Sequence, residues 1–400
     1  MKRNKINAID VGTTKVLTVM ADTDGEDLRI LGVGIAPSHG LEKGLLVNIK
    51  EAKESIRRSV RTAEQTAGHK LESAYVGVTG RHITSINNRG VVAITRTDQL
   101  VRPGDLKRVL QVAQSVKVPS DHQLLHVVPR TYVVDGQEGV ENPVGMHGFR
   151  LDAETHIVTA AATSIQNLTK CIRGVGIEID DLVLEGFASA EAVLAPEERE
   201  SGVMLADMGG GTTDVAIFKN NSIFHTSILP VAGYQISRDI AVGLGLSFEL
   251  AEEMKKKYGN VMPAEERDLS DMKLTEDGHS ISYHELSQII LFRVDELLRL
   301  MMLELPGTDY SRLVPAGLVL TGGTAKLPGI SELASKVTRL PVRIGTPPQL
   351  LGVSDALRDP AASTGVGLLL WKMRNHGTKN FRPKRNGFVE LASRVFRLFK

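Results

Sequence analysis

The same short pattern occurs twice in this sequence, once near the N-terminus and once in the middle. In residues 6–20 an apolar run ends at Asp10, and a glycine and two threonines separate it from a second apolar run. In residues 203–218 the run to Asp207 is followed by three glycines and two threonines before the next apolar run. Each copy predicts two strands joined by a tight polar turn. The repeat indicates a fold of two related halves whose turns face each other across one ligand.

Both predicted turns carry groups that suit a phosphate. Glycine leaves backbone N–H groups uncovered and tolerates positive φ, so a glycine turn can form a nest of donors. Lys15 adds a positive charge. Asp207 ends its strand and Asp214 lies just past the second turn, so both put carboxylates where a phosphate would need Mg²⁺ to tolerate them. Asp10 ends the equivalent strand of the first copy. The predicted phosphate-binding residues are Gly12, Thr13, Thr14 and Lys15 in the first turn and Gly209, Gly210, Gly211, Thr212 and Thr213 in the second.

The second turn matches neither of two common phosphate-binding loops. No Gly-Lys-Ser/Thr follows it, which excludes the Walker loop, and the next segment has the pattern of a strand rather than of a helix, which excludes the dinucleotide fingerprint. Taken alone, residues 203–218 fit a glycine hairpin without a ligand equally well. The earlier copy of the pattern is what favours a phosphate site.

Composition separates the C-terminal end from the rest of the chain. From Lys372 onward there are nine Lys and Arg residues and one acid, Glu390, whereas the remaining chain has 39 basic and 46 acidic residues. The formal charge of +1 therefore conceals a basic tail on an acidic body. The lone Cys171 excludes an intramolecular disulfide and fits a reducing compartment. We expect neither a signal peptide nor a membrane span.

Residues 387–400 predict an amphipathic helix, preceded by a polar linker over 375–386. At about 100° per residue its apolar side chains fall within an arc of about 160°. The helix is too short to span a bilayer, so it would lie in the interface against anionic lipid. The predicted membrane residues are Phe388, Leu391, Arg394, Val395, Phe396, Arg397, Leu398, Phe399 and Lys400. The basic flanks argue against a docked terminal helix, and the one-sided aromatic residues argue against nucleic-acid binding.

Between the two hairpins, helical periodicity predicts a helix over 49–67, and residues 81–160 predict a compact inserted unit. We expect separate strands at 83–86 and 91–95 in this unit and a loop over 135–148. Its histidines lack metal-ligand spacing, so we expect structural or surface roles for them. Beyond the second hairpin, residues 263–278 are polar and acidic and predict a further loop.

Other residues could contact the rest of a nucleotide. Gly322 and Gly323 leave room for a flat ring against the backbone, and Glu252 and Lys255 share one helical face from which they could bind ribose hydroxyls. Glu185 is a candidate for positioning water, as is Glu191 on the same helix. For each carboxylate alone an ordinary helix position is the simpler explanation, and for the Glu252–Lys255 pair a solvated salt bridge.

Taken together, these features resemble the superfamily of actin, the heat-shock chaperones and the sugar kinases. The resemblance lies in the two hairpin turns, Gly322–Gly323 and the small-residue segments 185–194 and 361–367. It implies an α/β, actin-like fold of two duplicated ribonuclease H-like domains, here with an inserted α+β subdomain and a C-terminal amphipathic helix. It also implies ATP and Mg²⁺ as cofactors, with Asp10 and Asp207 holding the metal through water. The implied catalytic residues are Asp10, Asp207 and Glu185, and the implied ATP-binding set adds Gly233, Glu252, Lys255, Gly322, Gly323 and Lys326 to the two turns.

Within that superfamily the chain resembles the FtsA family of bacterial cell-division proteins. The resemblance rests on the insert after Gly80, on residues 188–194 followed by 197–200, and on the tail. It implies self-assembly into filaments, attachment to the cytoplasmic side of the cell membrane at the division site, and other division proteins as partners. It also implies that the C-terminal peptide of FtsZ binds the second half, with Arg293 as a candidate contact. No residue matches actin's catalytic glutamine one to one, so the sequence predicts ATP binding and leaves hydrolysis open.

The predicted domain ranges follow this resemblance. They are 1–82, 161–200 and 345–374 for the first domain core, 83–160 for the insert, 201–236 and 305–344 for the second domain core, 237–304 for its smaller, partner-binding subdomain, 375–386 for the linker and 387–400 for the tail helix. Three alternatives fit less well. A sugar or acid kinase needs a polyol-binding set, a pilus-assembly actin homologue does not need the tail, and a chaperone needs a substrate domain after the second half.

Overall fold

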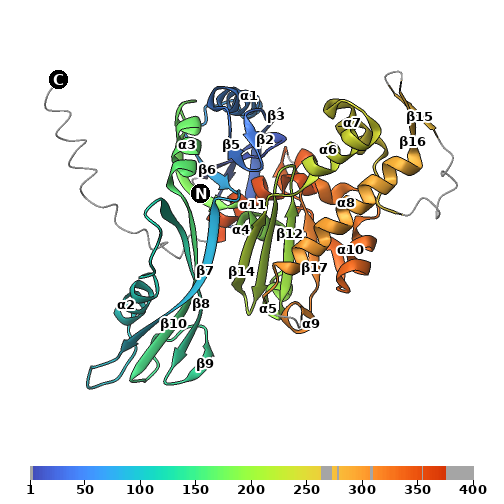
Figure 1. Ribbon diagram of the computed structural model, residues 1–400. Coiled ribbons are helices and arrows are strands. Elements are labelled where there is room, and N and C mark those ends of the chain that lie inside the picture. Colours follow the sequence, from blue (N-terminus) through green and yellow to red (C-terminus); the bar gives the residue numbers. More distant parts are fainter. Residues whose placement is uncertain (1–2, 263–272, 277–278, 307–309, 354, 375–400) are drawn as a thin grey trace.

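The computed structural model describes residues 3–262, 273–276, 279–306, 310–353 and 355–374 (Figure 1). The predicted linker and tail helix, with all the predicted membrane residues, lie outside the described residues. No helix within the described ranges is long and apolar enough to cross a membrane.

Two sheets that share an order of five strands form the two halves, and the first sheet has a sixth strand, β19, beside β3. The first has the order β11-β6-β1-β2-β3-β19 and the second β14-β13-β12-β17-β18. The strands of the first sheet are β1 (Asn4–Val11), β2 (Lys15–Thr23), β3 (Leu28–Pro37), β6 (Ser73–Val78), β11 (Glu178–Leu184) and the short β19 (Leu351–Gly352). Those of the second are β12 (Val203–Met208), β13 (Thr213–Lys219), β14 (Ser222–Leu229), β17 (Leu318–Thr321) and β18 (Val342–Ile344).

In each half an antiparallel meander of three strands is followed by two parallel strands. β1 pairs with β2 antiparallel and with β6 parallel, and β12 pairs in the same way with β13 and β17. Strands covered on both faces are apolar almost throughout, and every residue of β12 is buried. The shared order confirms the prediction of two related halves.

Helix α1 (Ile49–Ala67) covers one face of the first sheet and has the predicted bounds. The side chain of Asn48 accepts hydrogen bonds from the first free N–H groups, and Gly68 ends the helix in the left-handed conformation. Its apolar face packs very close to β3, because a Cβ atom on Gly34 would overlap the carbonyl oxygen of Ser59. The Ser59 hydroxyl donates to the Gly34 carbonyl at 2.8 Å.

Two helices of small residues cross between the halves, as Figure 1 shows: α4 (Glu185–Val193) and α11 (Ser363–Arg374). Both are buried over most of their length. A Cβ atom on Gly367 would overlap the carbonyl of Ala188, so glycine is needed at the crossing. The two small-residue segments 185–194 and 361–367 thus pack directly against each other.

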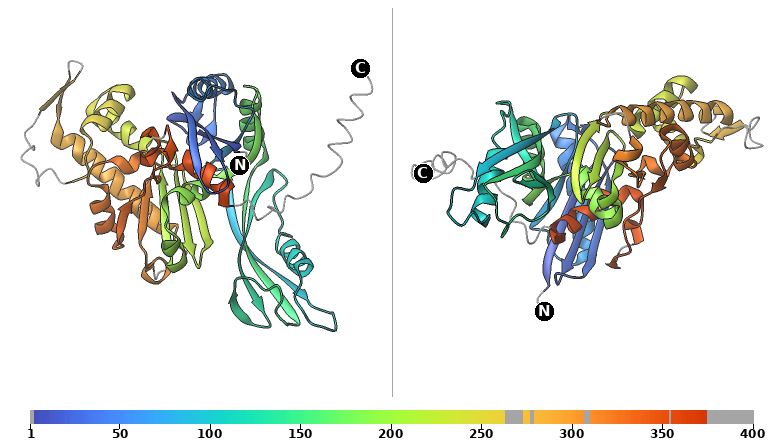
Figure 2. Two further views of the ribbon diagram at one scale, coloured as in Figure 1. Left: turned by 180° about the vertical axis from the view of Figure 1, so that it is seen from behind. Right: turned by 90° about the horizontal axis from the view of Figure 1, so that it is seen from below.

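The insert is a four-stranded antiparallel sheet of order β7-β10-β8-β9 with one helix, and it projects away from the first half (Figures 1 and 2). Its elements are β7 (Ile83–Ala93), α2 (Pro103–Ala113), β8 (His122–Val134), β9 (Gln137–Val140) and β10 (Arg150–Ala161). The prediction of two separate strands is wrong, because β7 pairs with β10 without a break through its polar centre. The prediction of a loop over 135–148 is wrong at β9, which pairs with the end of β8.

The insert also contacts β14 of the second half. The Ser85 hydroxyl donates to the Thr226 carbonyl at 2.9 Å, and the Asn87 amide donates to the Phe224 carbonyl at 3.1 Å. His156 is buried between them, with Nδ1 2.7 Å from Asn87 Oδ1 and Nε2 2.9 Å from Thr226 Oγ1. The insert therefore bridges the two halves.

The second half carries a mainly helical subdomain on its outer side (Figure 1). It consists of α6 (Gly233–Leu244), α7 (Phe248–Tyr258), β15 (Lys273–Glu276), β16 (His279–Ser282) and α8 (Tyr283–Leu303). The predicted loop over 263–278 is wrong at β15, which pairs antiparallel with β16. The remaining elements are the short pair β4 (Leu41–Glu42) and β5 (Leu45–Leu46), α3 (Ala162–Arg173), α5 (Pro196–Ser201), α9 (Tyr310–Leu313), α10 (Ile330–Thr338), η2 (Thr324–Lys326), η3 (Asp355–Leu357) and η4 (Pro360–Ala362).

Candidate functional site

The two predicted turns meet in the structure, one from each half. A Cβ atom on Gly210 would overlap Cγ2 of Thr14, and a Cβ atom on Gly211 would overlap Oγ1 of Thr13. Both contacts are possible only because Gly210 and Gly211 of the second turn have no side chain. The halves therefore touch at the residues predicted to hold a phosphate.

Four buried carboxylates gather beside the turns. Asp10 lies near the end of β1, Asp207 near the end of β12, Asp214 at the start of β13, and Glu185 is the first residue of α4. Each is less than 9% exposed. Because β1 and β12 occupy equivalent places in the two sheets, the fold places Asp10 and Asp207 at equivalent positions.

Hydroxyl groups from distant segments hold two of these carboxylates. Asp207 accepts hydrogen bonds from Ser189 of α4 and from Thr364 of α11, the latter at 3.0 Å. Asp214 accepts from Thr79, which follows β6, at 2.7 and 2.8 Å. Sequence reasoning did not assign these roles. Ser189 and Thr364 do belong to the small-residue segments that the sequence singled out, whereas Thr79 carries no local signal.

Burial dominates the electrostatics of the cluster. It raises the pKa of Asp10 to about 7, with nearby Lys15 lowering this pKa and Asp207 raising it. Burial likewise raises the pKa of Asp214 to about 8, raises that of Asp207, and raises that of Glu185 well above its ordinary value. Burial lowers the pKa of the Lys15 ammonium. One lysine does not compensate four carboxylates, so the site favours an additional cation.

The donor set fits a cation held through water. Within the described ranges, no three carboxylate, imidazole or thiol groups converge closely enough to hold a metal ion directly. Carboxylate oxygens are nevertheless the ligands that Mg²⁺ prefers, and this ion usually keeps several of its waters. That Asp10 and Asp207 would hold Mg²⁺ through water stays a prediction.

The predicted ribose residues lie close to the second turn. Lys255 donates to the Gly233 carbonyl at 3.0 Å and forms an ion pair with Glu252 at 2.6 Å. The salt bridge that the sequence offered as the simpler explanation is therefore present, but at 12% and 19% exposure of its two side chains it is mostly buried rather than solvated. The N–H of Gly233 and the hydroxyl of Thr324 both donate to the Gly209 carbonyl, at 3.2 and 2.7 Å.

The predicted base-binding segment adjoins the same turn. A Cβ atom on Gly322 would overlap Oδ1 of Asp207, whereas one on Gly323 would have ordinary van der Waals space. Lys326 forms an ion pair with Asp359. Lys15 donates to the carbonyl of Ala361 at 2.6 Å, just before α11.

Two sequence candidates lie elsewhere. Arg293 on α8 forms ion pairs with Asp239 and Glu296, so local acids already compensate its charge. Glu191 does not join the carboxylate cluster, although it shares α4 with Glu185. Its carboxylate is held by Arg199 at 3.0 Å and by Arg374 at 3.1 Å.

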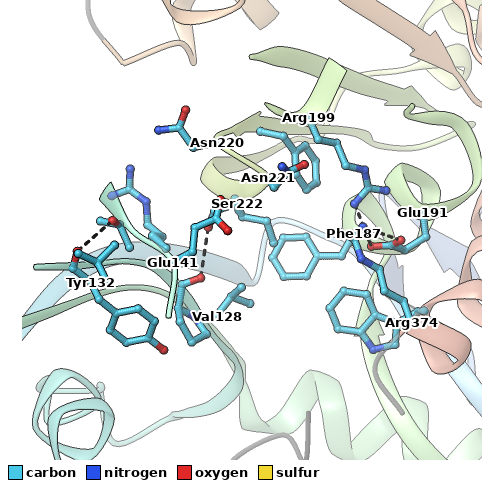
Figure 3. A pocket seen from close by; sticks show the side chains of 17 residues that line it. Val128, Tyr132, Glu141, Phe187, Glu191, Arg199, Asn220, Asn221, Ser222 and Arg374 are labelled. Carbon is cyan, nitrogen blue, oxygen red and sulfur yellow. Dashed lines mark hydrogen bonds and ion pairs between the residues drawn. The ribbon is translucent and has the colours of Figure 1, made fainter. Parts of the chain in front are cut away.

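Glu191 lines a separate cavity of about 440 Å³ (Figure 3). The insert, α4, the β13–β14 turn and the end of α11 form its walls. Phe187 and Trp371 stack on one side at 5.9 Å between ring centroids, and the Ser222 hydroxyl donates to the Pro129 carbonyl on the other. The sequence analysis contained no expectation for this cavity.

Duplicated sheets of one strand order, joined by crossing helices and facing each other through two glycine turns, define the actin-like class of proteins. Solved structures with this fold include a PilM–PilN type IV pilus biogenesis complex, with 14% identity, a TM-score of 0.65 and coverage of 93% of this chain and 99% of that chain. MreB5 of Spiroplasma citri bound to ADP matches with 12% identity, a TM-score of 0.55 and coverage of 93% and 97%. These likenesses confirm the predicted fold class.

The sequence comparisons identify the family. The family model of cell division protein FtsA matches residues 204–367, and that of the SHS2 domain inserted in FtsA matches 80–159. The chain is 43% identical to cell division protein FtsA of Pseudomonas aeruginosa, covering 92% of this chain and 89% of that one. It is 37% identical to the Neisseria meningitidis protein, covering 96% and 94%. The chain belongs to the FtsA family, which confirms the predicted resemblance and supports an actin-like role in cell division.

Proposed function

We propose that this protein binds Mg·ATP between its two halves and anchors FtsZ filaments to the cytoplasmic side of the cell membrane at the division site. The observation that carries nucleotide binding is the meeting of two glycine turns beside four buried carboxylates and one lysine. The family supplies the context of cell division. The fold neighbour MreB5 of Spiroplasma citri, which was solved bound to ADP, supports the choice of a nucleotide.

In this proposal each part of the cleft binds one part of Mg·ATP. The N–H groups of the two turns and Lys15 hold the phosphates, and Asp10 and Asp207 hold Mg²⁺ through water. Glu252 and Lys255 face the ribose and the Gly322–Gly323 segment the base. The metal would neutralise phosphate charge that the carboxylates alone would repel.

Hydrolysis of ATP is expected to be slow or absent. Glu185 is the carboxylate that the sequence singled out for positioning water, and burial raises its pKa well above the ordinary value. A raised pKa favours the protonated form of the carboxyl group, which does not accept a proton from water. We therefore propose that the nucleotide acts mainly as a switch, which closes the cleft and favours self-assembly.

Membrane attachment is proposed for the C-terminal helix over 387–400, which lies outside the described residues. A fully buried large side chain contributes about 1.5–3 kcal/mol, and each basic residue near anionic lipid about 1 kcal/mol. Ordering the helix offsets part of this gain, so a single tail should bind weakly. Assembly into filaments would present many tails to one surface and strengthen attachment by avidity.

The proposed partner site is the smaller subdomain over 237–304, where the C-terminal peptide of FtsZ would bind. Arg293 remains the proposed contact for this acidic peptide, which would have to compete with Asp239 and Glu296. The insert over 83–160 would contact neighbouring copies, and further division proteins would bind the assembled filament. We propose no nucleic-acid partner.

Peptide recruitment to liposomes tests this function. The full-length protein is mixed with anionic liposomes, Mg·ATP and a fluorescent FtsZ C-terminal peptide, and the peptide in the liposome pellet is measured. We expect the peptide to sediment only when both protein and liposomes are present. Deletion of 387–400 should abolish sedimentation while peptide binding in solution persists. Sedimentation of protein and peptide that survives the deletion would contradict the anchor.

The proposed binding of Mg·ATP has a separate test. Asp207→Ala removes the carboxylate that Ser189 and Thr364 hold, and it should weaken Mg·ATP binding about tenfold or more. A titration monitored by calorimetry measures this loss. Unchanged affinity would remove Asp207 from the site without affecting the anchor.

A further inference from the structure

Lys43 adopts a backbone conformation that is unusual for its residue type. It forms the two-residue turn between β4 and β5 together with Gly44, and the φ angles of the two residues are 48° and 74°. Such turns favour Asn-Gly, because positive φ at both positions is costly for residues with a larger side chain. A lysine therefore occupies a position where asparagine would fit the backbone better. Backbone strain of this kind often accompanies function.

The Lys43–Gly44 turn lies against the candidate nucleotide site. A Cβ atom on Gly211 would be 3.0 Å from Cα of Lys43. On its other side, a Cβ atom on Gly44 would be 2.9 Å from Cα of Gly80, the residue after Thr79. Thr79 in turn donates to Asp214. The Lys43–Gly44 turn thus contacts the second glycine turn on one side and, on the other, the segment whose Thr79 binds Asp214.

The Lys43 side chain is exposed, and no ion pair or hydrogen bond involves its ammonium group among the residues that the structure describes. Its flexible four-carbon stem is long enough to carry the ammonium across the adjacent turn. A phosphate in the turn would bind this charge directly.

The order of contacts along the second glycine turn indicates which phosphate of a bound nucleotide would be nearest to Lys43. Gly233 and Thr324, from the segments proposed for the nucleoside, both bind the carbonyl of Gly209. Gly211, at the other end of the turn, meets Thr13 and Lys43. The nucleoside end therefore lies toward Gly209 and the terminal phosphate toward Gly211.

We propose that Lys43 binds the terminal phosphate of a nucleoside triphosphate, so that the site prefers the triphosphate over the diphosphate. This inference rests on the proposed nucleotide function and assigns a residue that determines specificity within it. It also gives a reason for lysine at a left-handed position, since a phosphate contact would be kept there at a cost in stability.

The test compares the affinities of Mg·ADP and of a slowly hydrolysed ATP analogue, Mg·AMPPNP, for the full-length protein. Lys43→Asn should weaken AMPPNP binding about tenfold, as expected for loss of one charge-assisted contact, and change ADP binding less than about twofold. The same variant should raise the melting temperature by about 1–3 °C, because asparagine suits the left-handed turn. Lys43→Arg should retain the preference. Lys107→Asn, an equal charge change on α2 of the insert, should alter neither affinity.

The outcomes separate the two proposals. An unchanged AMPPNP-to-ADP ratio in Lys43→Asn would overturn the role of Lys43, whatever happens to the melting temperature. This includes the case in which both affinities fall by the same factor, because such a loss would indicate a distorted turn. A wild-type protein that binds neither nucleotide would remove the proposed function itself, and the role of Lys43 with it.

Discussion

Gly210 determines how closely the two halves can approach. Its missing side chain leaves room for Thr14 of the opposite turn, and a Cβ atom would overlap the threonine Cγ2. In a closely packed contact such an overlap must move one of the two backbones. The residue therefore controls the geometry between domains as well as the exposure of its own N–H group.

We expect Gly210→Ala to weaken Mg·ATP binding by about tenfold or more, because the added methyl group separates the two phosphate-binding turns. Thr14→Ser removes the overlapping Cγ2 atom but keeps the hydroxyl. The double variant Gly210→Ala/Thr14→Ser should therefore recover part of the lost affinity. Calorimetric titration of the two single variants and the double variant measures this coupling, and strictly additive losses would contradict it.

The sequence identified residues whose chemistry is local. Asp10, Asp207 and the glycines of both turns could be found because the turn motif contains carboxylates, donors and glycines in one short stretch. Thr79 and Lys43 could not be found, since their importance depends on neighbours far away in the chain. Thr79 meets Asp214 across 135 residues of sequence. Positive φ at Lys43 follows from a turn type that its sequence does not favour.

At the scale of elements, the insert contains buried neutral histidines. Burial, together with smaller effects of nearby His225, Arg130 and His126, lowers the pKa of His156 from the ordinary 6.5 to about 3. Burial also lowers the pKa of His126 to about 4. The unfolded chain takes up protons near pH 6.5 that the folded protein excludes. The stability contributed by these groups is therefore complete above pH 6.5 and is lost as pH falls from there toward 3.

His156→Gln should make unfolding less sensitive to pH. Each such histidine contributes a slope of about 1 kcal/mol per pH unit to the free energy of unfolding between pH 6.5 and 5. Glutamine removes this contribution and still provides one hydrogen-bond donor and one acceptor at the end of the side chain. Denaturant unfolding at several pH values measures the slope. Thr226→Val provides the matched control, because it removes the hydrogen bond to His156 without removing a titrating group.

Thr226→Val should therefore lower stability and leave the slope unchanged. An equal slope in wild-type protein and His156→Gln would show that His156 does not carry the pH dependence. The raised pKa values of Asp10 and Asp214 act in the opposite direction, since their contribution to stability is lost as pH rises through about 7 to 8. The contribution of His156 is therefore measured as the difference in pH slope between wild-type protein and His156→Gln, because Asp10 and Asp214 affect both proteins equally.

Element prediction succeeded where periodicity was strong and failed where polar residues interrupted a strand. The helix over Ile49–Ala67 has a continuous apolar face, and its bounds could be read from the sequence. The polar centre of β7 suggested a break, but tertiary pairing with β10 continues through it. Asn87 in that centre is polar because it faces β14 and His156 rather than an apolar core.

At the scale of the whole molecule, charge is divided between body and tail. The nine basic residues from Lys372 onward belong to a chain whose remainder has seven more acidic than basic residues. An anionic membrane would attract the tail and repel the body. Attachment through one weak helix would then depend on how many copies assemble.

Liposome binding should rise more steeply than linearly with protein concentration in Mg·ATP, because assembled copies share one surface. Phe396→Ser/Phe399→Ser keeps the charge and should abolish co-sedimentation at every concentration. Arg394→Gln/Arg397→Gln keeps the apolar face and should weaken binding mainly at low salt. A linear rise for the wild-type protein would contradict the avidity argument, and normal binding by the serine variant would show that charge alone attaches the tail.

The contact between the insert and β14 has a mechanical consequence. Two rigid bodies joined only by a hinge keep one free rotation, and every further contact between them constrains it. In this protein the crossing helices, the glycine turns and the insert all join the halves. Rotation of one half against the other must carry the insert along or break its contacts with β14. Displacement of the insert would therefore be coupled to the separation of the two glycine turns.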